Sequence, residues 1–346
     1  TSQGRVIDPS LIFGTSPTMS ATAARQDFSV VASRMFGWGM VALLAAFMIS
    51  NQLMINLGWS GLAPLFENGA EGGQAWLHAG IYLVAVIGAC VYAQMTGNRT
   101  LRADSEVISS LGAYLIRAAF WIVLLIGVVD AAISFLRVEG LLAAVVGQEM
   151  TTQLGRPIYR GANIHVPLMA LGAVIAFFSR GLGFVWLALL IVVAELSIVF
   201  TRFVFSYEQA FMGDLVRFWY AALFLFASAY TLIEEGHVRV DVFYANFTDR
   251  RKGLVNAIGT ILLGMTMCWV ILIVGMGNKS SIINNPVMNF EVSQSGFGMY
   301  TKYLMAAFLG VFAITMLIEF AAYFLSAVAN YRDEPGGREV SDSPAH

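Results

Sequence analysis

The chain alternates long apolar runs with short polar segments along nearly its whole length. A membrane-spanning helix needs about 20 mainly apolar residues. Seven runs meet this need, at residues 36–57, 76–95, 113–136, 182–205, 215–233, 254–277 and 303–328. An eighth run, 164–178, is shorter and reads as a short span, a re-entrant piece or an interfacial helix. The pattern predicts an all-α polytopic membrane protein with about eight transmembrane helices, seven being the alternative.

The distribution of basic residues favours eight helices. Arg and Lys concentrate in the cytoplasmic segments of membrane proteins. With eight spans and both termini cytoplasmic, the inner segments hold more than twice as many of them as the outer segments. With seven spans, the N-terminal tail and the segment 96–112 conflict with the rest. We therefore expect both ends inside, with the longest outer loops at 137–163 and 278–302.

The amino-acid composition and the absence of known enzyme motifs exclude several classes of function. Hydrophobic residues make up 58% of the 346 positions and charged residues only 12%, half of the roughly 25% typical of soluble proteins. The net charge of −2 gives no reason to expect a nucleic-acid partner. The chain has no nucleophile elbow, P-loop, dinucleotide fingerprint or zinc-ligand spacing. We expect no enzyme activity, cofactor or metal.

Four ionisable residues fall within apolar runs, where charges are costly and functional by default. They are Arg117, Asp130, Glu195 and Glu319. Arg117 and Asp130 are thirteen positions apart, about 220° around a helix, so they do not share a face. For Glu195, four alternatives stay open: an ion pair with Arg117, a polar groove against a partner protein, a protonated carboxyl in lipid, or a cation site.

Three short elements follow one another in the C-terminal half. The first is Arg202-Phe203-Val204-Phe205, and the second comprises Asp214, Arg217, Phe218 and Trp219. The third, His237-Val238-Arg239-Val240-Asp241, follows a predicted span, and its His237 and Asp241 are spaced to pair on one side of an interfacial helix. A functional role is not needed to explain the arginines of these elements. Arg202 and Arg217 can extend to the phosphates of the outer lipid leaflet, and Arg239 can fix the orientation of the neighbouring helix in the membrane.

In this order and spacing, the three elements resemble the small permease family of TRAP (tripartite ATP-independent periplasmic) transporters. The family usually shows a pair of acids, with a glutamate, where this chain has Gly213-Asp214. The resemblance covers about residues 180–330. It divides the chain into a cytoplasmic tail 1–35, additional transmembrane helices 36–178, a small-permease-like four-helix region 179–330, and a disordered cytoplasmic tail 331–346.

The resemblance implies a small integral subunit of the bacterial inner membrane. Such a subunit scaffolds the large permease of a secondary transporter, which takes up solute with a cation gradient and a periplasmic solute-binding protein. Membrane lipids are the remaining partner. Two alternatives stay open: a stand-alone transporter or channel, and a redox subunit whose haem is ligated by His78 and His165.

Overall fold

The structure, a computed structural model, describes residues 27–66, 73–179, 184–207, 209–233, 244, 246–292 and 298–336. These residues form helices and turns with no strand. Eight helical segments among them are long and apolar enough to cross a membrane: 28–57, 73–95, 101–138, 157–178, 185–205, 211–232, 249–276 and 302–331. The prediction of an all-α protein with eight spans is confirmed.

The N-terminal half contributes four of these segments. Its elements are α1 (Phe28–Leu57), α2 (Gly73–Met95), α3 (Leu101–Val138), α4 (Leu142–Val146), α5 (Gln148–Leu154), α6 (Pro157–Arg160), a π-helical turn (Gly161–His165) and α7 (Val166–Phe178). The run 164–178 is therefore the end of a longer helical segment, which starts with Pro157 in the first turn of α6. Proline suits this position because the first helical N–H has no intrahelical acceptor.

The C-terminal half supplies the other four spans. Its elements are α8 (Phe184–Phe205), α9 (Ala210–Ile233), α10 (Asp249–Gly259), a π-helical turn (Thr260–Met265), α11 (Thr266–Met276), α12 (Asn284–Met288) and α13 (Lys302–Tyr331). The segments α10, the π turn and α11 form one continuous apolar span.

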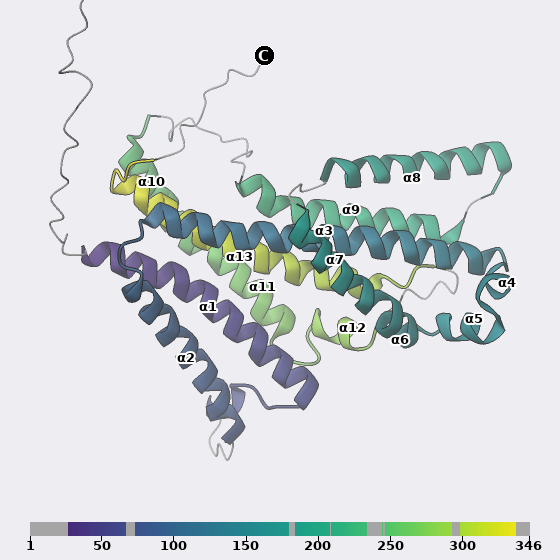
Figure 1. The fold of residues 1–346 in the computed structure, drawn as a ribbon, viewed down its shortest axis with the longest axis horizontal. Helices are drawn as coiled ribbons and strands as arrows, with labels where there is room; N and C mark the ends of the chain where they lie inside the picture. The colour runs from purple at the N-terminus through teal and green to yellow at the C-terminus, as the bar shows by residue number, and fades with distance from the viewer. Residues whose placement is uncertain are drawn as a thin grey trace, which may run out of the picture.

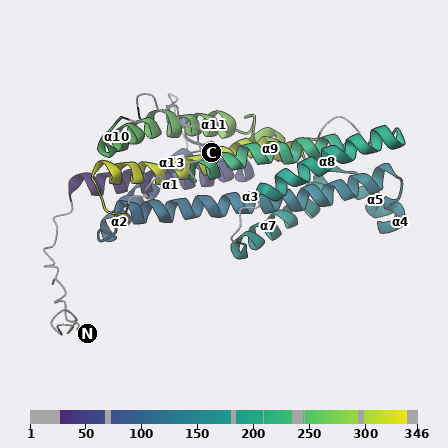
Figure 2. The same ribbon diagram turned by 90° about the horizontal axis from the view of Figure 1, so that it is seen from above.

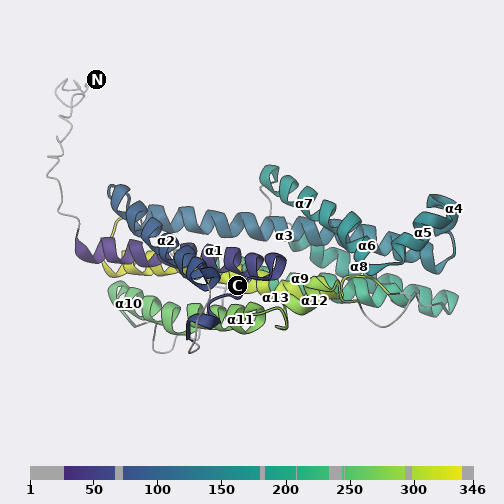
Figure 3. The same cartoon turned by 90° about the horizontal axis from the view of Figure 1, so that it is seen from below.

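Helix α13 lies at the centre of the bundle (Figure 1). The two views turned by 90° place it between α3 on one side and α10 with α11 on the other (Figures 2 and 3). Its contact with α3 is extensive, although α3 belongs to the N-terminal half. One apolar core contains Ile116 and Val123 of α3 together with Leu317 and Leu325 of α13. The additional N-terminal helices are thus part of the same packed body as the C-terminal four-helix region.

Glycines allow several helices to approach closely. A Cβ at Gly172 of α7 would lie 2.8 Å from the backbone nitrogen of Ile122 in α3. A Cβ at Gly253 of α10 would lie 2.6 Å from the carbonyl oxygen of Ala327 in α13. Because backbone atoms cannot move aside as a flexible side chain can, these two crossings require glycine.

A buried ion pair connects the first three helices. Nε of Arg34 in α1 donates to a carboxylate oxygen of Asp104 in α3 at 2.6 Å. Nη1 of Arg34 donates to the Ala93 carbonyl at 3.0 Å, and Nη2 to the Thr96 hydroxyl at 2.7 Å, both at the end of α2. Both side chains are almost fully buried. Such pairing lets α1 and α3 continue past their apolar runs, which explains why these helices are longer than the predicted spans.

Helix α3 has 38 residues, which corresponds to a length of about 57 Å. Its start is capped by the hydroxyl of Thr100, which accepts a hydrogen bond from the Ala103 amide at 3.1 Å. This length is nearly twice the hydrocarbon thickness of about 30 Å. Position along α3 is therefore a poor guide to membrane depth.

The expectation of a long outer loop at 137–163 is wrong, since α4, α5 and α6 occupy most of it. These helices are short and broken by Gly147 and Pro157, so they give no apolar periodicity that a sequence pattern could reveal. In the second expected loop, 278–302, α12 is the helical part.

Removing one partner of the Arg34–Asp104 pair should destabilise the protein strongly. Asp104→Ala leaves the Arg34 guanidinium buried without its carboxylate, at a cost of about 3–5 kcal/mol. The double variant Arg34→Met with Asp104→Leu removes both charges and should recover most of this loss. Thermal unfolding of the purified protein in detergent measures both effects. A double variant no more stable than Asp104→Ala would contradict the account.

Two glycines of α10 offer a matched comparison. Gly253→Ala should destabilise the protein by about 1–3 kcal/mol, because the added methyl meets the backbone of α13. Gly259→Ala should be neutral or stabilising by up to about 1 kcal/mol, since nothing lies within 4 Å of its Cβ and alanine favours a helix. The same unfolding measurement compares them. Equal effects would show that the α10–α13 contact is looser than described.

Candidate functional site

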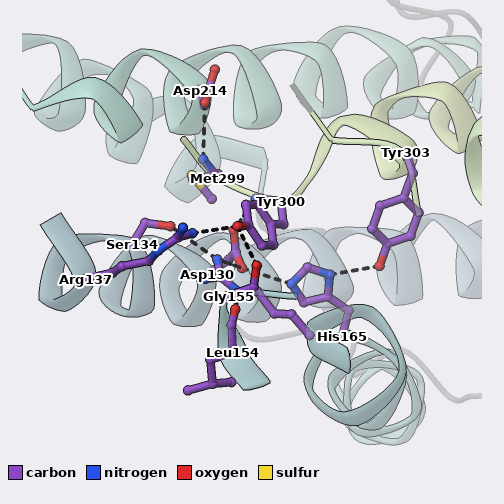
Figure 4. A network of polar contacts seen from close by, with 11 residues as sticks. Asp130, Ser134, Arg137, Leu154, Gly155, His165, Asp214, Met299, Tyr300 and Tyr303 are labelled. Carbon is purple, nitrogen blue, oxygen red and sulfur yellow. Dashed lines mark hydrogen bonds and ion pairs between the residues drawn. The ribbon is translucent and has the colours of Figure 1, made fainter. Parts of the chain in front are cut away.

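A fully buried carboxylate, Asp130 of α3, organises a polar network near the end of the helix. One of its oxygens accepts hydrogen bonds from Nη1 of Arg160 at 3.0 Å and from Nε2 of His165 at 3.1 Å. The other accepts from the backbone N–H of Tyr300 at 2.8 Å. The side chains of Asp130, Arg160 and His165 have no exposed surface. Figure 4 shows His165 and Tyr300 beside the carboxylate.

Arg160 reaches Asp130 because of the local chain path at the end of α6. Its Nε donates to the Leu154 carbonyl at 3.0 Å, and its guanidinium carbon lies 4.0 Å from the ring centroid of Tyr300. The π-helical turn then begins at Gly161, which packs so closely on the Phe290 ring that a side chain there would overlap it. The extra residue in a π turn rotates the positions that follow it. His165 ends this turn and faces Asp130.

Two tyrosines close the network from the C-terminal half. The Tyr300 hydroxyl donates to the Gly155 carbonyl at 2.9 Å and lies 2.5 Å from Nη1 of Arg137. The Tyr303 hydroxyl lies 2.8 Å from Nδ1 of His165, and the two rings are nearly parallel. The network therefore joins α3, α6 and the π turn to the segment that leads into α13.

The arrangement suits a structural clamp better than a reaction centre. The charge of Asp130 is balanced by Arg160, and two further N–H donors, from His165 and Tyr300, contact its oxygens. Both ring nitrogens of His165 are engaged, so this residue has no open position for an iron atom. The haem alternative therefore loses one of its two proposed ligands. Within the described ranges, no group of three or more His, Cys, Asp or Glu side chains is placed to hold a metal ion.

His78, the second proposed haem ligand, has an environment of its own between α1 and α2. Its Nδ1 is hydrogen-bonded to the Ser50 hydroxyl, and its ring packs edge-on against Trp59 with centroids 5.4 Å apart. Next to Ser50, Asn51 donates to the Met276 carbonyl at the end of α11. These contacts attach α1 and α2 to each other and to the C-terminal half.

Two of the other deep ionisable residues occupy α3 and α13. Glu319 of α13 accepts a hydrogen bond from the Ser109 hydroxyl of α3 at 3.1 Å. Arg117 is half-buried in α3, and its Nε has no hydrogen-bond partner among the described residues. It lies one turn after Tyr114, whose ring contacts Phe177 at the end of α7. Arg117 of α3 therefore lies beside the C-terminal end of α7, not beside the middle of α7.

Glu195 differs from these residues because its side chain is exposed on α8. It makes no hydrogen bond or ion pair with any described residue, and neither does Arg117 beyond its own helix. The Glu195–Arg117 pair considered from the sequence is therefore wrong. The two residues lie on helices that both pack against α9 rather than against each other.

The structure describes the first two of the three sequence elements but not the third. Arg202 is exposed in the last turn of α8. Asp214 of α9 accepts hydrogen bonds from the Met299 amide at 3.2 Å and from the exposed Arg217 at 3.4 Å. His237, Arg239 and Asp241 lie outside the described residues. Asp214 thus extends the Asp130 network through the neighbouring residues Met299 and Tyr300 (Figure 4).

Trp219 is one of the two aromatic residues of the second element, and it is buried. It packs against Gly127 of α3 so closely that a side chain at position 127 would overlap its indole. The second element therefore carries the contact between α3 and α9 as well as the acid that binds Met299.

Two ionisable contacts lie outside the spans. The hydrogen bond from the Tyr207 hydroxyl to Glu139, at 2.5 Å, raises the pKa of Tyr207, because deprotonation would put two negative charges together. The hydrogen bond from Arg332, at 2.6 Å, lowers the pKa of Asp27. Both join segments that are distant in sequence.

Sequence reasoning identified Asp130 but missed its partner. Arg160 falls within the segment 137–163 that is predicted to be an outer loop, and His165 enters only as one ligand in the haem alternative. The signal that could have found Arg160 was the need of a deep carboxylate for a cation, since buried charges are paired. The sequence offers several such cations, and nothing in their spacing selects Arg160.

The network should depend on the carboxylate far more than on the tyrosine hydroxyl. Asp130→Ala leaves Arg160 buried and uncompensated, at a cost of about 3–5 kcal/mol. Tyr300→Phe keeps the backbone donor and the ring beneath Arg160, so its cost should be about 1 kcal/mol. Thermal unfolding in detergent measures both. A Tyr300→Phe variant as unstable as Asp130→Ala would show that the hydroxyl organises the network.

Comparison with known proteins adds one finding. Residues 188–329 match the family model of the tripartite ATP-independent periplasmic transporters, DctQ component. No curated protein and no solved structure matches the chain significantly. The resemblance to TRAP small permeases is thereby confirmed for this part of the chain. Residues 188–329, called the DctQ domain below, thus match the small permease component of TRAP transporters, and an N-terminal extension precedes them.

Proposed function

We propose that this chain is the small membrane subunit of a TRAP-type secondary transporter. In this role it scaffolds a large permease, which takes up solute with the energy of a cation gradient after delivery by a periplasmic solute-binding protein. The observation that carries the proposal is the DctQ domain at residues 188–329.

The distribution of charge supports a scaffold. The ionised groups Arg34, Asp104, Asp130 and Arg160 are paired within the chain and buried. A protein that braces a moving partner benefits from a rigid body and a wide apolar surface. The outward faces of α8 and α2 supply such a surface, with only 11% and 17% of their spans buried.

The N-terminal extension enlarges this scaffold. It shares one core with the DctQ domain through α3 and α13, and it is attached at one end by the Asp130 network. At the opposite end, Nη2 of Arg102 in α3 donates to the Asn330 side chain at 2.9 Å. A brace made of both parts moves as one unit, because these contacts lie at both ends of the α3–α13 pair.

The topology follows from the basic residues. We propose the bacterial inner membrane as the location, with both termini cytoplasmic. The periplasmic side then includes α4, α5 and α12, where a solute-binding protein would dock. The domain division and the roles of Arg202, Asp214, Arg217, His237, Arg239 and Asp241 as subunit contacts are part of the same proposal.

Reconstitution tests this function. The purified chain in proteoliposomes should show no solute uptake by itself, because carrying the solute belongs to the partner. When the large permease of the same transporter, its binding protein and an inward sodium gradient are added, uptake should clearly exceed that of the large permease without this chain. Radiolabelled solute uptake measures the difference.

Two outcomes would contradict the proposal. Uptake by the chain alone would favour the stand-alone transporter. A large permease that neither copurifies with the chain nor gains uptake from it would exclude the scaffold role.

A further inference from the structure

Glu195 is the only ionisable residue of α8 before Arg202, and it lies at the middle of the helix. Ten residues separate it from the end of α8 at Phe205, which corresponds to about 15 Å. This is half the thickness of a hydrocarbon core of about 30 Å. The carboxyl thus lies near the depth at which an isolated charge is least favourable.

The surroundings of Glu195 within the chain are apolar and open. The exposed side chains of Val192, Leu196 and Val199 flank it on the helix surface. The side of α8 that packs against α9 is formed by Leu187, Ile191 and Ala194. Glu195 lies beside this contact, not within it, and its carboxyl forms no hydrogen bond or ion pair with any residue in the described ranges.

Helix α8 also has the most open surface of the eight spans, with 11% of its apolar window buried. Figure 1 shows it at the edge of the bundle, beside α9. Arg202 lies seven positions after Glu195, about 20° away around the helix, so the two residues form a line along one side. This face of α8 is thus apolar except for two ionisable residues on one side, whereas a helix face that contacts lipid alone is expected to be apolar throughout.

The chain itself shows how buried carboxylates are satisfied in this protein. Asp104 is met by Arg34 and Asp130 by Arg160, each pair formed between helices. Glu195 also carries a carboxyl at membrane depth, but it is exposed, and it meets no cation among the residues that the structure describes. Charge complementarity therefore calls for a basic side chain from a neighbouring membrane helix.

We propose that the face of α8 formed by Val192, Glu195, Leu196 and Val199 is a docking surface for the large permease, and that Glu195 pairs with a basic side chain of that partner within the membrane. The inference rests on the proposed function and adds to it the place of the contact with the large permease and the charged residue within that contact. The DctQ domain, not the N-terminal extension, then carries this contact.

Binding of the purified large permease to the purified full chain in nanodiscs tests the surface. Glu195→Leu removes the acceptor and should weaken binding about three- to thirtyfold, the range expected for one polar contact between helices. Glu195→Gln keeps a hydrogen-bond acceptor without the charge and should give a smaller loss. Glu195→Lys places two cations together and should give the largest loss.

Val193→Ala is the matched control. Val193 is exposed on the same helix but about 160° away from Glu195. This variant should bind as the unchanged chain does. A loss equal to that of Glu195→Leu would place the contact elsewhere on α8 and overturn the proposal.

The unfolding temperature of the chain without its partner distinguishes a docking role of Glu195 from a role in stabilising the fold of the chain itself. Without the partner, Glu195→Leu should leave the unfolding temperature unchanged or raise it, because leucine suits a lipid-facing position. In the complex, the same variant should lower it. A lower unfolding temperature in the solitary chain would assign Glu195 to the bundle or to a second copy of this chain, and would overturn the inference.

The failures can be told apart. If the unchanged chain does not bind the large permease, the proposed function fails. If it binds and all three Glu195 variants bind equally well, the function stands and Glu195 is a lipid-facing carboxyl, which overturns this inference alone.

Discussion

An ionised side chain surrounded by apolar groups is strongly unfavourable unless an opposite charge or several hydrogen bonds meet it. This constraint organises the molecule. Arg34 with Asp104 and Arg160 with Asp130 each join helices that are distant in sequence. Both pairs include α3, one near its beginning and one near its end. They therefore fix α3 at two points and, through it, the rest of the N-terminal extension.

Helix α3 in turn determines how the extension and the DctQ domain fit together. It packs along α13, the central helix of the DctQ domain, and it contacts Trp219 of α9 through Gly127. The Asp130 network continues into Tyr300 and Tyr303, so the clamp of the extension closes on residues of the DctQ domain. The two parts behave as one body because both the apolar core and the polar network cross their boundary.

The arrangement also explains why Glu195 stands apart. The folded chain supplies a cation to its buried carboxylates Asp104 and Asp130, and it supplies the Ser109 hydroxyl to Glu319. Helix α8 contacts mainly α9, which leaves most of its surface without a partner. A carboxyl at the middle of such a surface marks a position that an additional protein completes.

The sequence determined the number and the approximate positions of the spans, because hydrocarbon thickness sets a minimum length for an apolar helix and the runs are long enough to read. It also predicted the family of the C-terminal part, through the three elements that begin at Arg202, Asp214 and His237, in that order. The short helices between Val138 and Pro157 and the partner of Asp130 were decided only by the tertiary structure. The physical reason is that apolar length is a local property, whereas the choice of Arg160 over other cations depends on which helix ends meet in space.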